Sequence, residues 1–324
     1  MFIAQAFKSH HDWWRYLVGI IVVFVAAQIG SIPFIVAVGY KSMQDGGSFS
    51  DMADMSKLMT ILDSNLTLFL VLLSFVAGLV ALLFIIRYLH NQPLIEATTT
   101  RPKIDWKRFF VGFGLVAVTT ITFTIIDYNL NPDNYVLQFQ LVPFLILALI
   151  VILLMPLQTS MEEYVFRGYL MQGIGVLAKN RWLPLILTSV TFGLLHLSNP
   201  EVGKLGNIIM VYYIGTGFLL GIMTLMDEGL ELALGFHAGN NIVAALLVTA
   251  DWTVFQTNSI LKDVSEPSAG LDIILPVLIL YPIYLIILAK IYKWTNWKEK
   301  LFGKVEKPIV IEEESHTDPI EKIL

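Results

Sequence analysis

Long apolar runs separated by short polar stretches recur along the whole chain. The first extends from Trp14 to Val38, and eight more follow at 66–87, 109–126, 141–157, 160–178, 182–197, 205–226, 232–250 and 272–292. Most can cross a hydrocarbon core of about 30 Å as a helix. Helices satisfy their own backbone hydrogen bonds in lipid, and the runs lack the alternation of barrel strands. The pattern therefore predicts an all-α, polytopic transmembrane helical bundle with about eight transmembrane helices.

Two of these runs leave the number of spans open. The run 160–178 carries three charged residues, and is either a separate element or a continuation of 141–157 past a kink at Pro156. Simple span counting places Glu162 just beyond the cytoplasmic end of 141–157. The run 182–197 is short for a span.

Composition supports a membrane protein and excludes several other classes. The chain is 56% hydrophobic and 15% charged, whereas an average soluble domain carries about 25% charged residues. The net charge of −5 lacks the basic surplus of a nucleic-acid binder, so we expect no nucleic-acid partner. The sequence has no cysteine, which excludes disulfides, cysteine nucleophiles and cysteine-ligated metals.

Lysine and arginine in the short loops predict the orientation of the bundle. The 87–108 loop, the turn near 180 and the stretch 290–307 are basic, whereas loops 39–65 and 127–140 are acidic or neutral. Because basic loops stay in the cytoplasm, we expect both termini and the 87–108 loop there. We expect an integral, multi-pass protein in the cell (inner) membrane of a prokaryote, with the lipid bilayer as its surroundings.

Charged residues inside apolar spans are costly and mark candidate chemistry. Glu162 and Glu163 precede Arg167 in one such run. In a helix Glu163 and Arg167 are four residues apart and can pair, whereas Glu162 points about 100° away. One carboxylate is then uncompensated and is a candidate general base. A salt-bridged patch at a helix end is the structural alternative.

Two further groups add histidines. Phe192 and His196 stand four residues apart, as do His237 and Asn241, and of the six histidines only His196 and His237 lie in apolar spans. Both groups have a structural alternative as hydrogen-bonding residues that join helices. Together with Glu162 they suit hydrolysis by an activated water. Zinc held by Glu162, His196 and His237 is the other possibility, although the helical zinc-protease signature His-Glu-x-x-His is absent from the sequence.

The order Glu162-Glu163-x-x-x-Arg167, Phe192-x-x-x-His196, His237-x-x-x-Asn241 resembles the three-motif pattern of the CPBP family. These are the CAAX prenyl proteases and the Abi-type, bacteriocin-processing intramembrane proteases. The resemblance covers roughly 140–250 and implies a catalytic core there. It leaves N-terminal helices and loops at 1–139, the last loop and helix at 251–302, and a polar, mobile tail at 303–324.

The resemblance implies an intramembrane endopeptidase acting on a hydrophobic, lipidated or membrane-protein substrate. Glu162 would be the general base and His196 its partner, while His237 and Asn241 would stabilise the oxyanion. Glu163, Arg167 and Phe192 would support them. The family has been labelled as metalloproteases, but the residues equally suit glutamate-dependent hydrolysis without a cofactor, and divalent zinc stays open.

Two other classes remain possible from the sequence. The protein would be a non-catalytic membrane scaffold or bacteriocin-immunity protein if the polar residues only join helices. It would be a proton-coupled transporter if Glu162 and Glu163 relay protons, although no internal repeat is evident.

Overall fold

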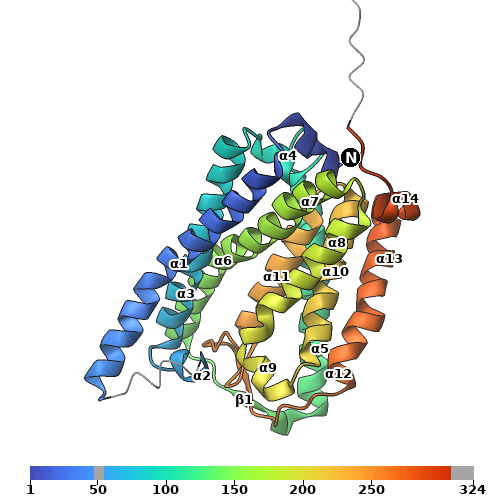
Figure 1. Cartoon of the computed structure of the whole chain (residues 1–324). Helices are drawn as coiled ribbons and strands as arrows, with labels where there is room; N and C mark the ends of the chain where they lie inside the picture. Colours follow the sequence, from blue (N-terminus) through green and yellow to red (C-terminus); the bar gives the residue numbers. More distant parts are fainter. Residues whose placement is uncertain (47–54, 308–324) are drawn as a thin grey trace, which may run out of the picture.

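The computed structural model describes residues 1–46 and 55–307, which form a bundle of helices with short connections (Figure 1). The long helices are α1 (Trp13–Gln44), α3 (Ser64–Phe84), α5 (Trp106–Leu130), α6 (Leu141–Glu163), α10 (Ile209–Asp227) and α11 (Glu231–Leu247). The shorter α-helices are α2 (Met55–Leu58), α4 (Leu94–Thr98), α7 (Met171–Ala178), α8 (Trp182–Leu194), α9 (Pro200–Leu205), α12 (Leu271–Leu275), α13 (Tyr281–Tyr292) and α14 (Trp297–Phe302). The 3₁₀ and π segments are η1 (Ile3–Lys8), η3 (Ile85–Leu89), η4 (Pro132–Asn134), η5 (Tyr164–Leu170), η6 (Leu195–Ser198) and η7 (Pro276–Leu280).

The predicted polytopic helical bundle is confirmed. Six segments of the described chain are long and apolar enough to cross a membrane: Trp13–Gln44, Ser64–Leu89, Trp106–Leu130, Leu141–Ala178, Ile209–Asp227 and Ile273–Tyr292. Two shorter helices, Trp182–Ser198 and the 17-residue α11, stand among them. The sequence predicts about eight transmembrane helices, and the described chain has six long apolar helices and these two shorter ones.

The segment 141–178 is one continuous helix. Pro156 lies inside α6 without ending it, and η5 and α7 continue the same span of 38 residues. The middle portion, η5, is π-helical and contains Arg167. Such wider turns inside α-helices occur frequently at functional sites. Because the helix does not stop at residue 157, Glu162 lies inside the bundle, and its expected place beyond the end of a span is wrong.

The two ends of the bundle differ in structure. The N-terminus, α4, α7 and α14 lie at one end, and α2, α9 and β1 lie at the other (Figure 1). The first end therefore collects the basic loops that the sequence assigns to the cytoplasm. At the second end, three short strands follow helices or loops: β1 (Tyr135–Leu137), β2 (Val248–Ala250) and β3 (Leu261–Asp263). They pair in the order β1-β3-β2, antiparallel and then parallel, so the apolar run 232–250 ends as a strand.

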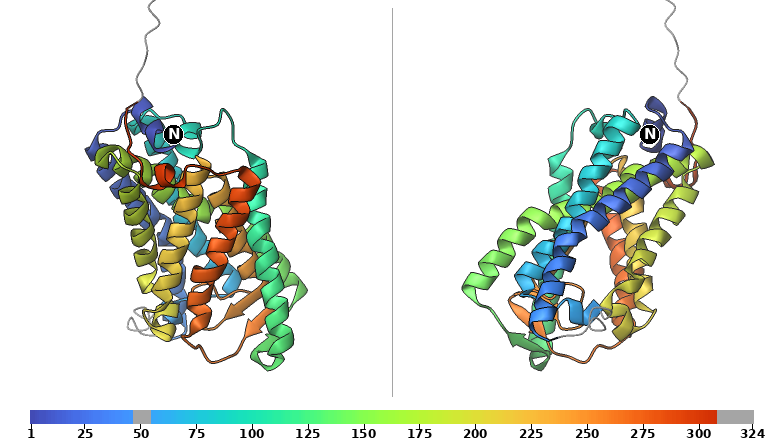
Figure 2. Two further views of the ribbon diagram at one scale, coloured as in Figure 1. Left: turned by 90° about the vertical axis from the view of Figure 1, so that its right-hand side faces the viewer. Right: turned by 60° about the vertical axis from the view of Figure 1, so that its left-hand side comes forward.

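A network of ion pairs stabilises the end of the bundle at which the N-terminus lies, called here the N-terminal end. Arg101 donates from Nη2 to Asp227 at 2.8 Å and from Nη1 to Glu231 at 3.0 Å, and Arg108 also pairs with Asp227. Asp227 ends α10 and Glu231 begins α11. The network thus fixes the turn from which α11 descends toward the middle of the bundle (Figure 2).

The start of the predicted C-terminal tail is packed against the bundle. Val305 is buried, its N–H donates to the Lys179 carbonyl, and Asn180 forms a bridge with Lys304. The predicted tail therefore cannot begin at 303, because an apolar side chain anchors this stretch. The remainder, 308–324, lies outside the described residues.

Helices α5 and α11 approach closely because glycines line their interface. A Cβ on Gly235 would lie 1.9 Å from the Phe109 carbonyl oxygen, whereas a Cβ on Gly114 would meet no atom within 4 Å. Small residues in a helix interface let the two backbones touch in membranes.

We expect Gly235→Ala to lower the free energy of unfolding by about 1–3 kcal/mol or more. Gly114→Ala, the matched control, should leave it unchanged or raise it slightly. Equal melting temperatures of the two variants in detergent would contradict this interface.

Candidate active site

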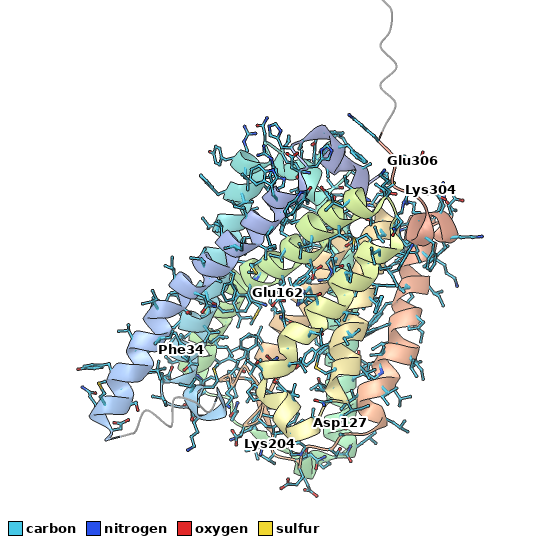
Figure 3. The ribbon with its side chains drawn as sticks, in the orientation of Figure 1. Phe34, Asp127, Glu162, Lys204, Lys304 and Glu306 are labelled. Carbon is cyan, nitrogen blue, oxygen red and sulfur yellow. The ribbon has the colours of Figure 1, made fainter. Side chains whose placement is uncertain are left out.

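Glu162 lies about midway between the two ends of the bundle, as its label shows in Figure 3. Its side chain keeps a relative exposure of 15%, whereas the side chain of Glu163 is fully buried. Both residues end α6, and α11 packs against this helix. Carboxylates at this depth are costly unless they are paired, so their partners decide what the site can do.

Glu163 and Arg167 form a buried ion pair. Arg167 donates from Nη1 to Glu163 Oε1 at 2.9 Å, and both side chains have zero exposure. Its Nη2 donates to the Gly217 carbonyl at 2.9 Å, and its guanidinium carbon lies 4.6 Å from the centre of the Phe192 ring. The predicted pairing four residues apart on one helix is confirmed. Arg167 compensates Glu163 and leaves Glu162 as the uncompensated acid.

His237 lies between the two carboxylates. Its Nδ1 is 2.8 Å from Glu163 Oε1, and its Nε2 is 3.4 Å from Glu162 Oε2. Because an ionised carboxylate only accepts hydrogen bonds, Nδ1 carries the proton that it donates to Glu163. Nε2 then carries a lone pair, and it accepts a hydrogen bond from Glu162 once that carboxylate has taken up a proton. The arrangement gives Glu162 a proton acceptor whose charged form is stabilised by Glu163.

Asn241 adds a second contact between α11 and α6, one helical turn beyond His237. Its Nδ2 donates to Gln158 Oε1 at 3.1 Å, and its Oδ1 accepts from Asn240 Nδ2 at 3.1 Å. One N–H of Asn241 remains for another acceptor. The candidate residues predicted from the sequence do not include Gln158. Its signal is the spacing: Gln158 is polar and lies four residues before Glu162, and therefore on the same face of the helix.

His196 is held on the α8 side of the bundle. Its Nδ1 lies 2.9 Å from the Phe192 carbonyl oxygen. Its ring stacks on Tyr213, with centroids 4.3 Å apart and planes at 21°. The Phe192 ring contacts both histidines, with its centroid 5.0 Å from that of His196 and 5.9 Å from that of His237. Phe192 therefore links the two histidines through aromatic packing.

The structure thus brings Glu162, Glu163, Arg167 and His237 into direct contact, and Asn241 lies one turn away on the face of α11 that bears His237. In the described part of the chain, no hydrogen bond or ion pair joins His196 to Glu162. His196 is connected to the others through Phe192. His237 contacts Glu162 directly, because α11 and α6 pack against each other and each residue lies on the packed face of its helix.

The proposed zinc ligands do not gather. Across residues 1–46 and 55–307, no group of three or more histidine and acidic side chains is arranged to hold a metal ion. Each histidine keeps Nε2 for a ligand, but the three side chains are separated: Glu162 and His237 meet between α6 and α11, whereas His196 stacks on Tyr213 of α10. These residues do not fit a zinc site, so we derive no chemical step through a metal.

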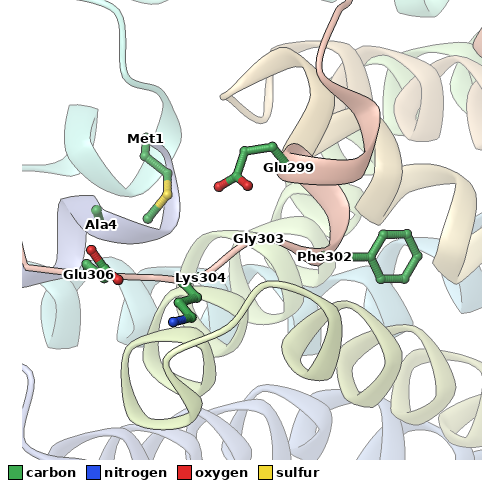
Figure 4. A pocket seen from close by; sticks show the side chains of 7 residues that line it. All are labelled: Met1, Ala4, Glu299, Phe302, Gly303, Lys304 and Glu306. Carbon is green, nitrogen blue, oxygen red and sulfur yellow. The ribbon is translucent and has the colours of Figure 1, made fainter.

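A cavity of about 630 Å³ lies elsewhere, at the N-terminal end of the bundle (Figure 4). Its lining comprises Met1, Ala4, Glu299, Phe302, Gly303, Lys304 and Glu306. Lys304 and Glu306 are far from Glu162 in Figure 3. This cavity is therefore separate from the polar groups in the middle of the membrane-crossing region.

One comparison matches the segment that carries these residues. Residues 140–243 match the family model described as Type II CAAX prenyl endopeptidase Rce1-like. The matched segment contains all seven residues of the three motifs, which confirms the resemblance to CPBP and CAAX proteases predicted from them. The six apolar helices define an integral, multi-pass membrane protein, and its segment 140–243 is similar to a CAAX-type intramembrane protease family.

One curated relative is similar over most of both chains. The chain is 28% identical over 252 residues to "Uncharacterized protein YyaK" of Bacillus subtilis (strain 168), which covers 76% of this chain and 82% of that protein. No solved structure matches the chain significantly.

Proposed function

We propose that this protein is an intramembrane endopeptidase that uses a water molecule activated by Glu162. The observation that carries the proposal is the position of His237 between two carboxylates, one compensated by Arg167 and one not. A bundle that only needed to join its helices would gain nothing from the second, uncompensated carboxylate, whose burial is costly. A carboxylate that acts as a general base has to pass its proton on before the next turnover, and His237 Nε2 lies 3.4 Å from Glu162 Oε2.

In the proposed mechanism the Glu162 carboxylate accepts a proton from water, and the hydroxide so formed attacks the scissile carbonyl carbon. His237 Nε2 receives this proton, and Glu163 stabilises the resulting imidazolium. The free N–H of Asn241 donates to the oxyanion of the tetrahedral intermediate. His196 offers Nε2 as a second acceptor for the attacking water. When the C–N bond breaks, the proton passes to the leaving amine, which completes the addition of water across the peptide bond.

The substrate we propose is a hydrophobic or lipidated peptide or membrane protein. Glu162 lies midway along the membrane-crossing bundle (Figure 3), so the scissile bond has to reach that depth. An apolar chain or lipid anchor lowers the cost of bringing a peptide bond there.

A cleavage assay tests this proposal. The purified protein in liposomes is incubated with a farnesylated CAAX peptide and with a pool of hydrophobic peptides in ¹⁸O-labelled water. We expect a new carboxyl terminus carrying the label, at a rate that a chelator changes by less than about twofold. A preparation from cells lacking the expression plasmid is the blank. Cleavage abolished by the chelator and restored by zinc would contradict metal-free activation, and a folded protein that cleaves none of the peptides would contradict the protease.

The contact between Gln158 and Asn241 yields a further prediction. We expect Gln158→Leu to lower the turnover number about 10- to 100-fold, because the amide of Asn241 loses the acceptor that orients it. Gln172→Leu is the matched control, since Gln172 is an equally buried amide further along the same helix that bonds to Gln92 and Glu96. Both variants should lose stability, but only Gln158→Leu should lose turnover per folded molecule. Equal turnover would show that Gln158 does not position Asn241.

A further inference from the structure

The ring of Tyr213 is held against His196 by its own surroundings. Tyr213 lies in the first turns of α10, and its hydroxyl accepts a hydrogen bond from Asn199 Nδ2 at 3.4 Å. Asn199 directly follows η6, the short segment that contains His196. Tyr213 therefore contacts the histidine with its face and the segment after it with its hydroxyl.

A second contact anchors the same segment. The buried carboxylate of Glu201 on α9 accepts a hydrogen bond from the Val254 N–H at 2.8 Å, which ties α9 to the loop after β2. Burial raises the pKa of Glu201 above its ordinary value, although the Val254 N–H opposes this shift. The chain on both sides of His196 is thus fixed, at Phe192 before it and at Glu201 after it.

The hydrogen bond of His196 determines its tautomer but not its orientation. A backbone carbonyl only accepts, so Nδ1 carries the proton and Nε2 carries the lone pair. The imidazole is attached at Cβ and bonded at Nδ1, and because a hydrogen bond tolerates about 30° of misalignment, the ring can still rotate about the Cβ–Cγ bond. Face-to-face contact with a second ring, with centroids 4.3 Å apart and planes at 21°, fixes the plane of the imidazole. Together the two contacts fix the direction in which Nε2 points.

We infer that Tyr213 is a positioning residue of the active site, which holds the His196 imidazole in the plane where Nε2 faces the reacting water. This inference rests on the proposed function, because it assigns Tyr213 a role in the same hydrolysis. The ring of Tyr213 performs this role, and the hydroxyl only supports it through Asn199. A tyrosine that merely fills space would affect stability without changing how His196 reacts.

The experiment compares Tyr213→Phe, Tyr213→Leu and Tyr213→Met in the full-length protein. Tyr88→Leu is the matched control, since Tyr88 is exposed and its ring contacts Phe84. Two quantities are measured: kcat and KM for a peptide that the wild type cleaves, and the rate at which diethyl pyrocarbonate modifies His196, followed by mass spectrometry of its peptide. The second quantity does not depend on catalysis. The methionine variant provides the flexible replacement if the leucine variant does not fold.

We expect Tyr213→Leu and Tyr213→Met to lower kcat about 10- to 100-fold with KM changed by less than about twofold. The same variants should change the modification rate of His196 severalfold while leaving those of His10 and His11 unchanged. Tyr213→Phe and Tyr88→Leu should behave as the wild type in both measurements. An unchanged modification rate in the folded leucine or methionine variant overturns the inference, as does a loss of kcat shared by the phenylalanine variant. If the wild type cleaves nothing but His196 responds as expected, the proposed function fails and the support of the imidazole by Tyr213 stands.

Discussion

Replacing Glu162 by glutamine should reduce peptide hydrolysis by a factor of about 10²–10⁴ while the protein keeps its melting temperature. Glutamine has the same shape as glutamate but cannot accept a proton from water. The carboxylate has no compensating arginine, and its contact with His237 at 3.4 Å is the longer of the two that His237 makes. Losing that charge removes the base without breaking the buried pair between Glu163 and Arg167. The measurement is the initial rate of product formation per folded molecule, beside a thermal unfolding curve.

The matched control is Glu299→Gln, because Glu299 is an exposed carboxylate at the N-terminal end of the bundle, with a side-chain exposure of 67%. It should keep both rate and stability. Three results would tell against Glu162 as the base. Unchanged cleavage in Glu162→Gln would assign the base to another group, and loss of stability together with cleavage would favour a residue that joins helices. Proton-coupled flux without any cleaved peptide would favour a transporter.

The sequence was sufficient to predict the helical bundle and the pairing within each motif. Helix periodicity alone placed Glu163 and Arg167 on one face, and their side chains meet at 2.9 Å. It also placed His237 and Asn241 on a common face of α11, and both bond to α6. These are local relations along one helix, independent of how the helices pack, and the pair of Glu163 and Arg167 forms although Arg167 lies in the π-helical segment η5.

Relations between helices could not be predicted in the same way. The sequence predicts that His196 and Glu162 act on one water, and this stays a prediction. It does not predict the direct contact of His237 with Glu162, which depends on the packing of α11 against α6, or the stacking of His196 on Tyr213 of α10. The sequence does not mark Gln158 or Tyr213, since neither side chain is charged at neutral pH. The π-helical turn from Tyr164 to Leu170 leaves no signal in the hydrophobic pattern.

Replacing Arg167 by methionine should destabilise the protein by about 3–5 kcal/mol, because it leaves Glu163 as an uncompensated buried charge. Methionine fills most of the volume of the arginine stem, so the loss measures the charge and its hydrogen bonds more than a cavity. Both contacts of the guanidinium, with Glu163 and with the Gly217 carbonyl, disappear together. The melting temperature in detergent, followed by circular dichroism, measures the effect.

The double variant Glu163→Gln with Arg167→Met separates the charge from the packing. Glutamine still offers an oxygen to Nδ1 of His237 but carries no charge, so the double variant should recover part of the stability lost by Arg167→Met alone. Arg87→Met is the control, since Arg87 is exposed and its replacement should change the free energy of unfolding by less than about 0.5 kcal/mol. If Arg167→Met is as stable as the wild type, Glu163 does not depend on Arg167 for its charge. If the double variant is no more stable than Arg167→Met, the bond to Gly217 and the packing on Phe192 account for the loss instead of the ion pair.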